Sequence, residues 1–265
     1  MGFAGIFILA LIQGICEFLP ISSSGHMLLA QQVLKVDAGS GSNLELFLHL
    51  GTLFTILIFF RRKILALGLG LLSGCKDSWH YAFTLLLGCL PAGMLYLACR
   101  RRLEALSDSA LLAAAMLIFT GLILLYSRVP PRRAAITRLS WLQALLVGLA
   151  QCLALIPGIS RSGSTIIAAY ALGYPLPLAV EFSFLMNVPL LLGALFFKHK
   201  ELWCLINEPQ EAIVMLLACI IAATIGFLSL KILYKILEKN SFWKFGIYCM
   251  VIGVLASAAI MLKLL

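Results

Sequence analysis

The stretch QGICEFLPISSSGHM, residues 13–27, interrupts a region, 1–34, that is otherwise apolar enough for the interior of a lipid bilayer. It combines a proline, three consecutive serines, a glycine and a histidine. Such a stretch cannot continue as one membrane-spanning helix, because each unpaired backbone group in lipid costs several kcal/mol. It therefore predicts a re-entrant hairpin: one half-helix enters the membrane, the chain turns inside protein, and a second half-helix leaves.

The composition of the whole chain indicates a membrane protein with several spans. Of its 265 residues, 62% are hydrophobic and 12% are charged, and the mean hydropathy is +1.06. These values lie well above those of soluble domains. Six segments are apolar over lengths suited to a hydrocarbon core of about 30 Å. They are 44–60, 80–99, 109–127, 178–197, 211–233 and 243–263.

A second broken region, 139–172, resembles the first. The stretch QCLALIPGISRSG (151–163) aligns without gaps on QGICEFLPISSSG (13–25), and each is followed by a span with one acid, Glu45 or Glu181, expected to be buried. Broken segments at matching positions of two halves point to a site near the membrane midplane. The expected fold is an all-α polytopic membrane protein with six transmembrane helices and two re-entrant helical hairpins, 1–34 and 139–172. It forms a single integral domain, 1–265, with an inverted repeat of about 1–60 and 139–200.

The basic residues predict the orientation of the chain in the membrane. The side that holds 61–79, 128–138 and 231–244 carries twelve Lys and Arg, and the opposite side carries seven. By the positive-inside rule the richer side is cytoplasmic and both termini lie outside. Because these cations lie at segment ends, where lipid headgroups attract them, the net charge of +9 does not indicate nucleic acid.

The remaining basic residue, Arg161, lies inside the second hairpin, and Glu17 lies inside the first. Ionisable residues at membrane depth are costly and therefore indicate a functional site. The alternative is a structural ion pair between the two. The loop PGISRSGST (157–165) favours function, because a guanidinium beside several hydroxyls and the N-terminus of a helix beginning after Gly163 can bind phosphate. The alternative is that this loop only caps a helix, through Ser162 or Ser164.

The first hairpin contributes a second group of polar residues. Gln13 and Glu17 are four apart and share one helix face, so Glu17 could hold Mg²⁺ or Ca²⁺ if a substrate supplied further oxygens. The residues after them are candidate nucleophiles and proton carriers: Ser22, Ser23, Ser24 and His26. His49 is a weaker candidate, in the span that carries Glu45.

These two motifs, QGICEFLPISSSGH and PGISRSGST, resemble the signatures of the bacterial undecaprenyl-pyrophosphate phosphatase family of the bacitracin-resistance type (BacA/UppP). The resemblance covers essentially the whole chain. It implies removal of the terminal phosphate of undecaprenyl diphosphate, which recycles the lipid carrier of peptidoglycan synthesis, with a divalent cation. Gln13 takes the place of an acid in the first motif, and His49 stands where many members have Gln, which leaves the role of His49 open.

The resemblance also assigns roles by motif position. The two residues expected to hold the divalent cation are Gln13 and Glu17. The expected catalytic residues are Glu17, Ser23, His26 and Arg161. The residues expected to bind the diphosphate are Ser22, Ser24, Ser160, Arg161, Ser162 and Thr165. The protein would lie in the bacterial inner membrane with its active site open to the periplasmic side, and bacitracin would compete by binding the substrate.

Two other classes of protein share some of these features. A lipid-phosphate flippase or secondary transporter also uses inverted repeats with broken helices. An intramembrane serine protease could use Ser160 and His26, although Arg161 beside the serine suits phosphate better than a peptide. The sequence leaves open whether the nucleophile is Ser23, His26 or water, and whether the protein forms a homodimer.

Overall fold

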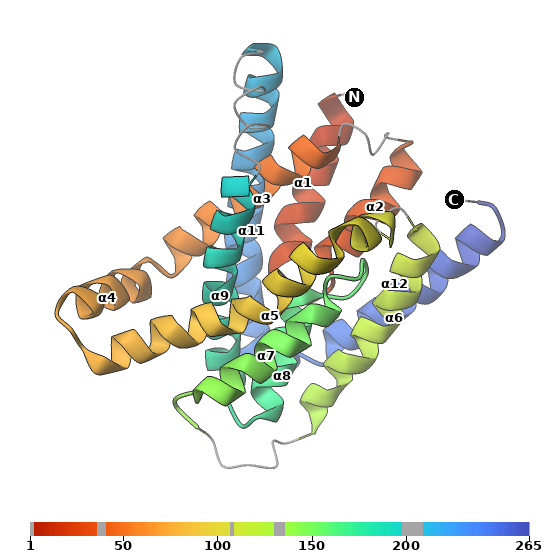
Figure 1. The fold of residues 1–265 in the computed structure, drawn as a ribbon. Coiled ribbons are helices and arrows are strands. Elements are labelled where there is room, and N and C mark those ends of the chain that lie inside the picture. Colours follow the sequence, from red (N-terminus) through yellow and green to blue (C-terminus); the bar gives the residue numbers. More distant parts are fainter. Residues whose placement is uncertain (1–2, 36–40, 107–108, 130–135, 198–208, 265) are drawn as a thin grey trace.

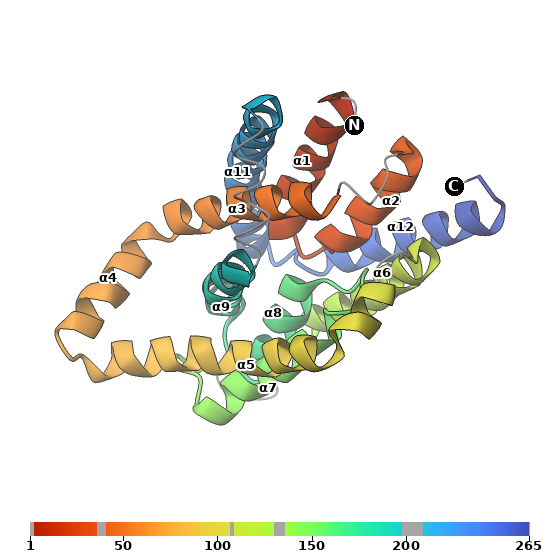
Figure 2. The same ribbon diagram turned by 45° about the horizontal axis from the view of Figure 1, so that its top comes forward.

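The computed structural model describes residues 3–35, 41–106, 109–129, 136–197 and 209–264, and within these ranges the chain is helical without strands (Figures 1 and 2). The helices are α1 (Phe3–Phe18), α2 (Ser23–Leu34), α3 (Gly41–Phe59), α4 (Arg61–Leu72), α5 (Lys76–Leu106), α6 (Ala110–Leu125), η2 (Tyr126–Arg128), α7 (Trp141–Leu153), α8 (Arg161–Ala171), α9 (Leu176–Phe197), α11 (Pro209–Glu238) and α12 (Lys244–Met261).

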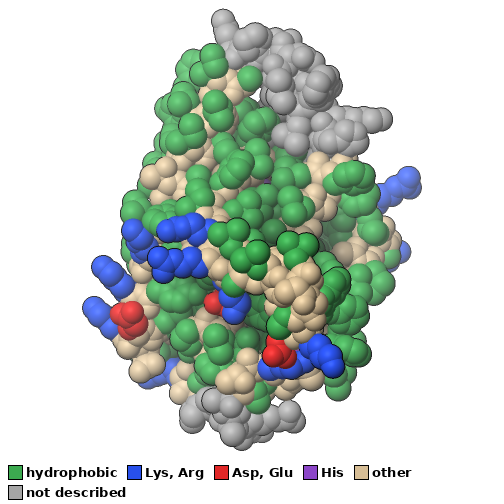
Figure 3. All heavy atoms as spheres, turned by 90° about the vertical axis from the view of Figure 1, so that its left-hand side faces the viewer, with side chains coloured by type: hydrophobic (Ala, Val, Ile, Leu, Met, Phe, Trp, Pro, Cys, Tyr) green, Lys and Arg blue, Asp and Glu red, His purple; other side chains and the backbone are tan. Residues whose placement is uncertain are grey.

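Five helices in the described ranges are long and apolar enough to cross a membrane, namely α5, α6, α9, α11 and α12. A sixth span is possible if α3 and α4, which meet at a bend of 74°, count as one. The α5 helix extends well beyond the predicted 80–99. Hydrophobic side chains cover most of the face in Figure 3, and the Lys and Arg side chains lie mainly in its lower half. The chain is therefore a multi-pass membrane protein.

Both broken regions fold as two helices joined at a polar tip. The first is α1 followed by α2, and the second is α7 followed by α8. The open end of the first hairpin lies at the top of Figure 1 and that of the second at the bottom, and their tips meet near the middle. Two helical hairpins thus bring polar loops from opposite ends of the molecule to one place.

Serine side chains begin both of the second half-helices. The Oγ of Ser22 accepts a hydrogen bond from the backbone N–H of Gly25, and the Oγ of Ser160 accepts one from Gly163. The predicted helix start after Gly163 is therefore wrong, as is the alternative cap at Ser162 or Ser164, because α8 begins at Arg161 and is capped by Ser160. Ser160 is the residue whose extended backbone leaves its hydroxyl free to accept from the first turn.

The tip of the second hairpin is held against α6. Gly158 has a φ of +92°, and a Cβ there would collide with the backbone carbonyl of Ala113, so only glycine fits. Thr120 donates a hydrogen bond to the carbonyl of Gly158 (2.9 Å) and accepts one from the N–H of Ser160 (3.0 Å). These contacts fix the backbone immediately before Arg161.

The long helices pack across the two halves of the chain. The α11 helix packs on α1 and α3, whereas α5 packs on α7 and α9, and α6 pairs with α12. Each hairpin and its acidic helix are thus supported by a helix from the other half of the sequence.

The acidic residues expected to be buried at equivalent positions differ in their surroundings. Glu181 is largely covered, and it pairs with Lys63 (2.9 Å) and accepts a hydrogen bond from Tyr81. Glu45 is exposed, so its predicted burial is wrong. It lies near the start of α3 and lines a cavity.

Candidate active site

A polar cavity of about 210 Å³ lies where the two hairpin tips meet. Its walls come from both tips and from α1, α3 and α9. The polar residues that line it are Gln13, Glu17, Ser22, Ser23, Ser24, Glu45, His49, Ser160, Arg161, Ser162 and Asn187. The structure therefore gathers most of the polar residues that the sequence singles out, although they lie more than 130 residues apart in the chain.

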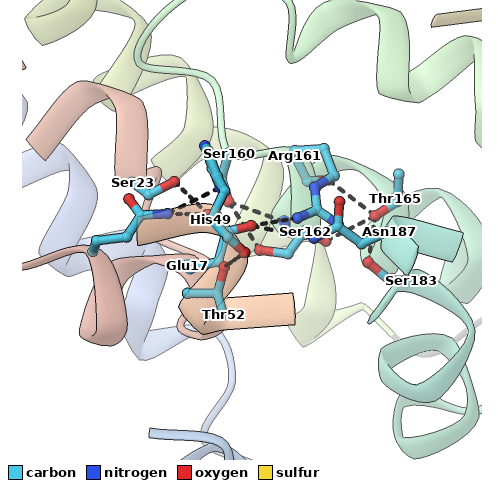
Figure 4. A network of polar contacts seen from close by, with 12 residues as sticks. Glu17, Ser23, His49, Thr52, Ser160, Arg161, Ser162, Thr165, Ser183 and Asn187 are labelled. Carbon is cyan, nitrogen blue, oxygen red and sulfur yellow. Dashed lines mark hydrogen bonds and ion pairs between the residues drawn. The ribbon is translucent and has the colours of Figure 1, made fainter. Parts of the chain in front are cut away.

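Glu17 is the centre of a buried network (Figure 4). Its Oε1 accepts hydrogen bonds from Arg161 Nη2 (2.6 Å) and Asn187 Nδ2 (3.3 Å). Its Oε2 accepts from Ser23 Oγ (2.8 Å) and Gln13 Nε2 (3.2 Å). The carboxylate is thus satisfied on both oxygens, as a buried charge requires. It also connects the first tip directly to the second.

Arg161 joins the two tips and keeps donor capacity for a ligand. Its Nη2 pairs with Glu17, while its Nη1 is buried and has no hydrogen-bond partner within the described residues. A buried guanidinium nitrogen without an acceptor is costly, and a phosphate oxygen would supply one. Arg161 is also the first residue of α8, and Ser23 is the first of α2, so two helix N-termini meet at the cavity. Both ends favour an anion.

Thr165, expected to bind diphosphate, does not line the cavity. It is fully buried, and its hydroxyl contacts the carbonyl oxygen of Arg161 (2.9 Å) and the hydroxyl of Ser183 on α9 (2.6 Å). It therefore ties the first turn of α8 to α9. The threonine lies on the same side of α8 as Arg161, one turn further along, where α9 rather than the cavity meets it.

The structure does not bring His26 to Ser23. The Nδ1 of His26 lies 2.9 Å from the carbonyl oxygen of Ser22, and its Nε2 lies 3.1 Å from the hydroxyl of Tyr248. Its ring also stacks on Tyr248. In this arrangement the group that accepts the hydrogen bond of Ser23 is Glu17, and the histidine of the cavity is His49.

The expected cation site at Glu17 and Gln13 is not well matched by the side chains present. Both oxygens of Glu17 already accept hydrogen bonds, and Gln13 presents its amide nitrogen, which is not a metal ligand. Nowhere in the described ranges do three His, Cys, Asp or Glu side chains gather as a metal site. Any cation here would take most of its ligands from the substrate and water.

Asn187 contacts Glu17 and was not singled out from the sequence. It is a buried amide in an apolar span, two residues before Pro189, so its polarity at membrane depth was a usable signal. The role of Tyr248 had no such signal, because a tyrosine in a late span shows nothing of its contact with His26, 222 residues earlier.

Comparison with known proteins identifies the family. Residues 6–255 match the family described as bacitracin resistance protein BacA. The chain belongs to this family. A relative named undecaprenyl-diphosphatase from Desulfatibacillum aliphaticivorans is 34% identical over 94% of this chain and 95% of its own length. Relatives with the same name from Rhodopirellula baltica and Alcanivorax borkumensis are 37% and 36% identical, with similar coverage.

Every residue that lines the cavity lies inside the part of the chain that matches the BacA family. The cavity thus belongs to the shared family core rather than to an addition at either terminus.

Proposed function

We propose that this protein is an undecaprenyl-diphosphatase, which converts undecaprenyl diphosphate to undecaprenyl phosphate and inorganic phosphate. The observation that carries the proposal is the arrangement around Glu17: a serine hydroxyl on one carboxylate oxygen and a guanidinium with one free nitrogen on the other. The names of the relatives support the same substrate. Phosphoryl transfer needs both a nucleophile and a positively charged group that stabilises the phosphate oxygens.

Binding of the terminal phosphate would use the donors that face the cavity. Arg161 Nη1 would donate to one phosphate oxygen, and the N-termini of α2 and α8 would favour the negative charge. The remaining donors are hydroxyls of the two tips: Ser22, Ser24, Ser160 and Ser162. Because the cavity is small, the apolar tail would stay in lipid while the diphosphate enters.

The chemistry would follow from the hydrogen bond between Ser23 and Glu17. The Ser23 oxygen attacks the terminal phosphorus, its proton passes to Glu17 Oε2, and the bond to the bridging oxygen breaks to release undecaprenyl phosphate. Phosphate oxygens at Arg161 Nη1 share the positive charge that stabilises Glu17 through Nη2, so the carboxylate accepts the proton more readily. Water then hydrolyses the phosphoserine to inorganic phosphate.

The proposal is tested by phosphate release from a C55 diphosphate by the purified protein in detergent. We expect one inorganic phosphate for each substrate molecule. A flippase or transporter would release none, because transport breaks no bond. A second reaction with a chelator addresses the cation. We expect less release there, because a divalent cation would arrive on the diphosphate oxygens and neutralise part of their charge.

We also propose that the membrane architecture is six spans with two re-entrant hairpins related as an inverted repeat. Two observations support it. The hairpins enter from opposite ends of the molecule, and each packs on a long helix from the other half of the sequence, α11 on the first and α5 on the second. The protein would lie in the bacterial inner membrane with the cavity open to the periplasm. Glu45, an exposed residue that lines the cavity next to the side with fewer basic residues, supports this direction.

The orientation is testable with single cysteines. Cys75 is exposed in the turn between α4 and α5, on the side with more basic residues, and Leu264 is exposed near the C-terminus. In intact cells, a variant that keeps only Cys75 should resist an impermeant thiol reagent, whereas Leu264→Cys in a cysteine-free chain should react. Permeabilised cells, in which both should react, provide the control. The reverse pattern would place the cavity on the cytoplasmic side.

A further inference from the structure

Two histidines lie near the candidate active site, and their contacts differ. His26 uses both ring nitrogens, on the carbonyl of Ser22 and the hydroxyl of Tyr248. His49 is half-buried in α3, lines the cavity, and belongs to the same network as Glu17 (Figure 4). The histidine available to a ligand in the cavity is therefore His49.

The contacts of Gln13 determine which nitrogen of His49 carries the proton. Glu17 Oε2 can only accept, so the end of the Gln13 amide that faces it at 3.2 Å must be the NH₂ group. The same nitrogen lies 3.2 Å from His49 Nδ1. Because an amide nitrogen donates and does not accept, Nδ1 is the acceptor, and the neutral ring carries its hydrogen on Nε2.

The Nε2 nitrogen is directed away from Gln13, since the two ring nitrogens point in nearly opposite directions. It has no hydrogen-bond partner among the residues that the structure describes. A neutral donor is thus held in a cavity that Arg161 and several serine hydroxyls also line. An oxygen of a phosphate group would satisfy it.

We infer that His49 is a substrate-binding residue whose Nε2–H donates a hydrogen bond to a non-bridging oxygen of the diphosphate. The inference rests on the proposed function, since it names a further contact within the same site. Glu17 acts on His49 through Gln13: the carboxylate orients the amide, and the amide holds the ring as an Nε2–H donor. In functional histidines generally, the hydrogen bond at one ring nitrogen fixes which nitrogen carries the proton.

The inference is tested with a prenyl methylenediphosphonate, in which a CH₂ group replaces the bridging oxygen so that the ligand binds but cannot be hydrolysed. His49→Phe keeps a ring but loses the donor, and we expect its Kd to rise about tenfold, as for one hydrogen bond. His49→Gln retains an N–H donor and should stay within about threefold of the parent protein. His80→Phe, outside this cavity, serves as the matched control and should bind like the parent protein.

Each outcome distinguishes this contact from a merely structural role. Equal weakening in the Phe and Gln variants would mean that His49 only supports packing, and unchanged binding in the Phe variant would remove it from the site. Either result overturns the inference, as does a parent protein that does not bind the diphosphonate. If binding depends on His49 but the parent releases no phosphate from a C55 diphosphate, the proposed hydrolysis fails while the contact stands.

Discussion

Replacing Ser23 with alanine is expected to lower kcat/KM by at least about a thousandfold, or about 4 kcal/mol of transition-state stabilisation. The reason is that Ser23 is the hydroxyl bonded to Glu17 (2.8 Å), so it has both a proton acceptor and a position at the start of α2. The measurement is phosphate release by the purified variant in detergent. Trapping a phosphoryl-enzyme that is labile in base and stable in acid would identify phosphoserine.

Ser24→Ala is the matched control for Ser23→Ala. The Ser24 hydroxyl is exposed at the same tip and contacts Ser22 rather than Glu17. As a binding hydroxyl it should cost only about 1–3 kcal/mol when removed. A loss of that smaller size in Ser23→Ala would show that Ser23 binds oxygen and does not attack. An acid-labile, base-stable phosphoryl-enzyme would transfer the role of nucleophile to a histidine.

Arg161→Lys is expected to lower kcat/KM at least about a hundredfold, or about 2.7 kcal/mol, although the positive charge is kept. A lysine has one terminal nitrogen, whereas Arg161 uses Nη2 for Glu17 and leaves Nη1 for phosphate. The variant can serve one of these acceptors well but not both. Activity is measured by phosphate release, and thermal unfolding in detergent checks that the variant is folded.

Arg138→Lys is the corresponding control, because Arg138 is an exposed residue whose ion pair with Asp77 (2.7 Å) lies outside the cavity. An exposed pair contributes about 0–1 kcal/mol, so this variant should keep near-normal activity and stability. Near-normal turnover in Arg161→Lys as well would refute the proposal that the guanidinium binds Glu17 and phosphate at the same time.

The helical fold and the two broken regions could be predicted from the sequence, because lipid imposes strict limits on length and on backbone hydrogen bonds. The bend between α3 and α4 was harder to predict. The 74° angle depends on how α4 packs on α5, which the sequence does not show. The start of α8 was misplaced by three residues, because Ser160, Ser162 and Ser164 are all good caps by residue type.

The composition of the candidate site could also be predicted, since Glu17, Arg161 and the serines are polar residues at membrane depth. Their individual contacts could not. The sequence ranks His26 above His49, because His26 is adjacent to the serines in the chain. The structure reverses this order through contacts with distant partners, Tyr248 for His26 and Gln13 for His49. Spacing along one helix predicts which residues share a face, but not which other helix that face meets.

The ion pair between Glu17 and Arg161 has a consequence for biosynthesis. Its partners are 144 residues apart, so Glu17 leaves the ribosome first and waits about 7–30 s for Arg161 at a translation rate of about 5–20 residues/s. During that interval the first hairpin lacks Arg161 as a partner for its carboxylate. If the hairpin is re-entrant as proposed, it would stay near the membrane surface, or keep Glu17 protonated, until α8 is inserted. The ion pair therefore forms only when one of the earliest segments of the chain docks onto a segment made 144 residues later.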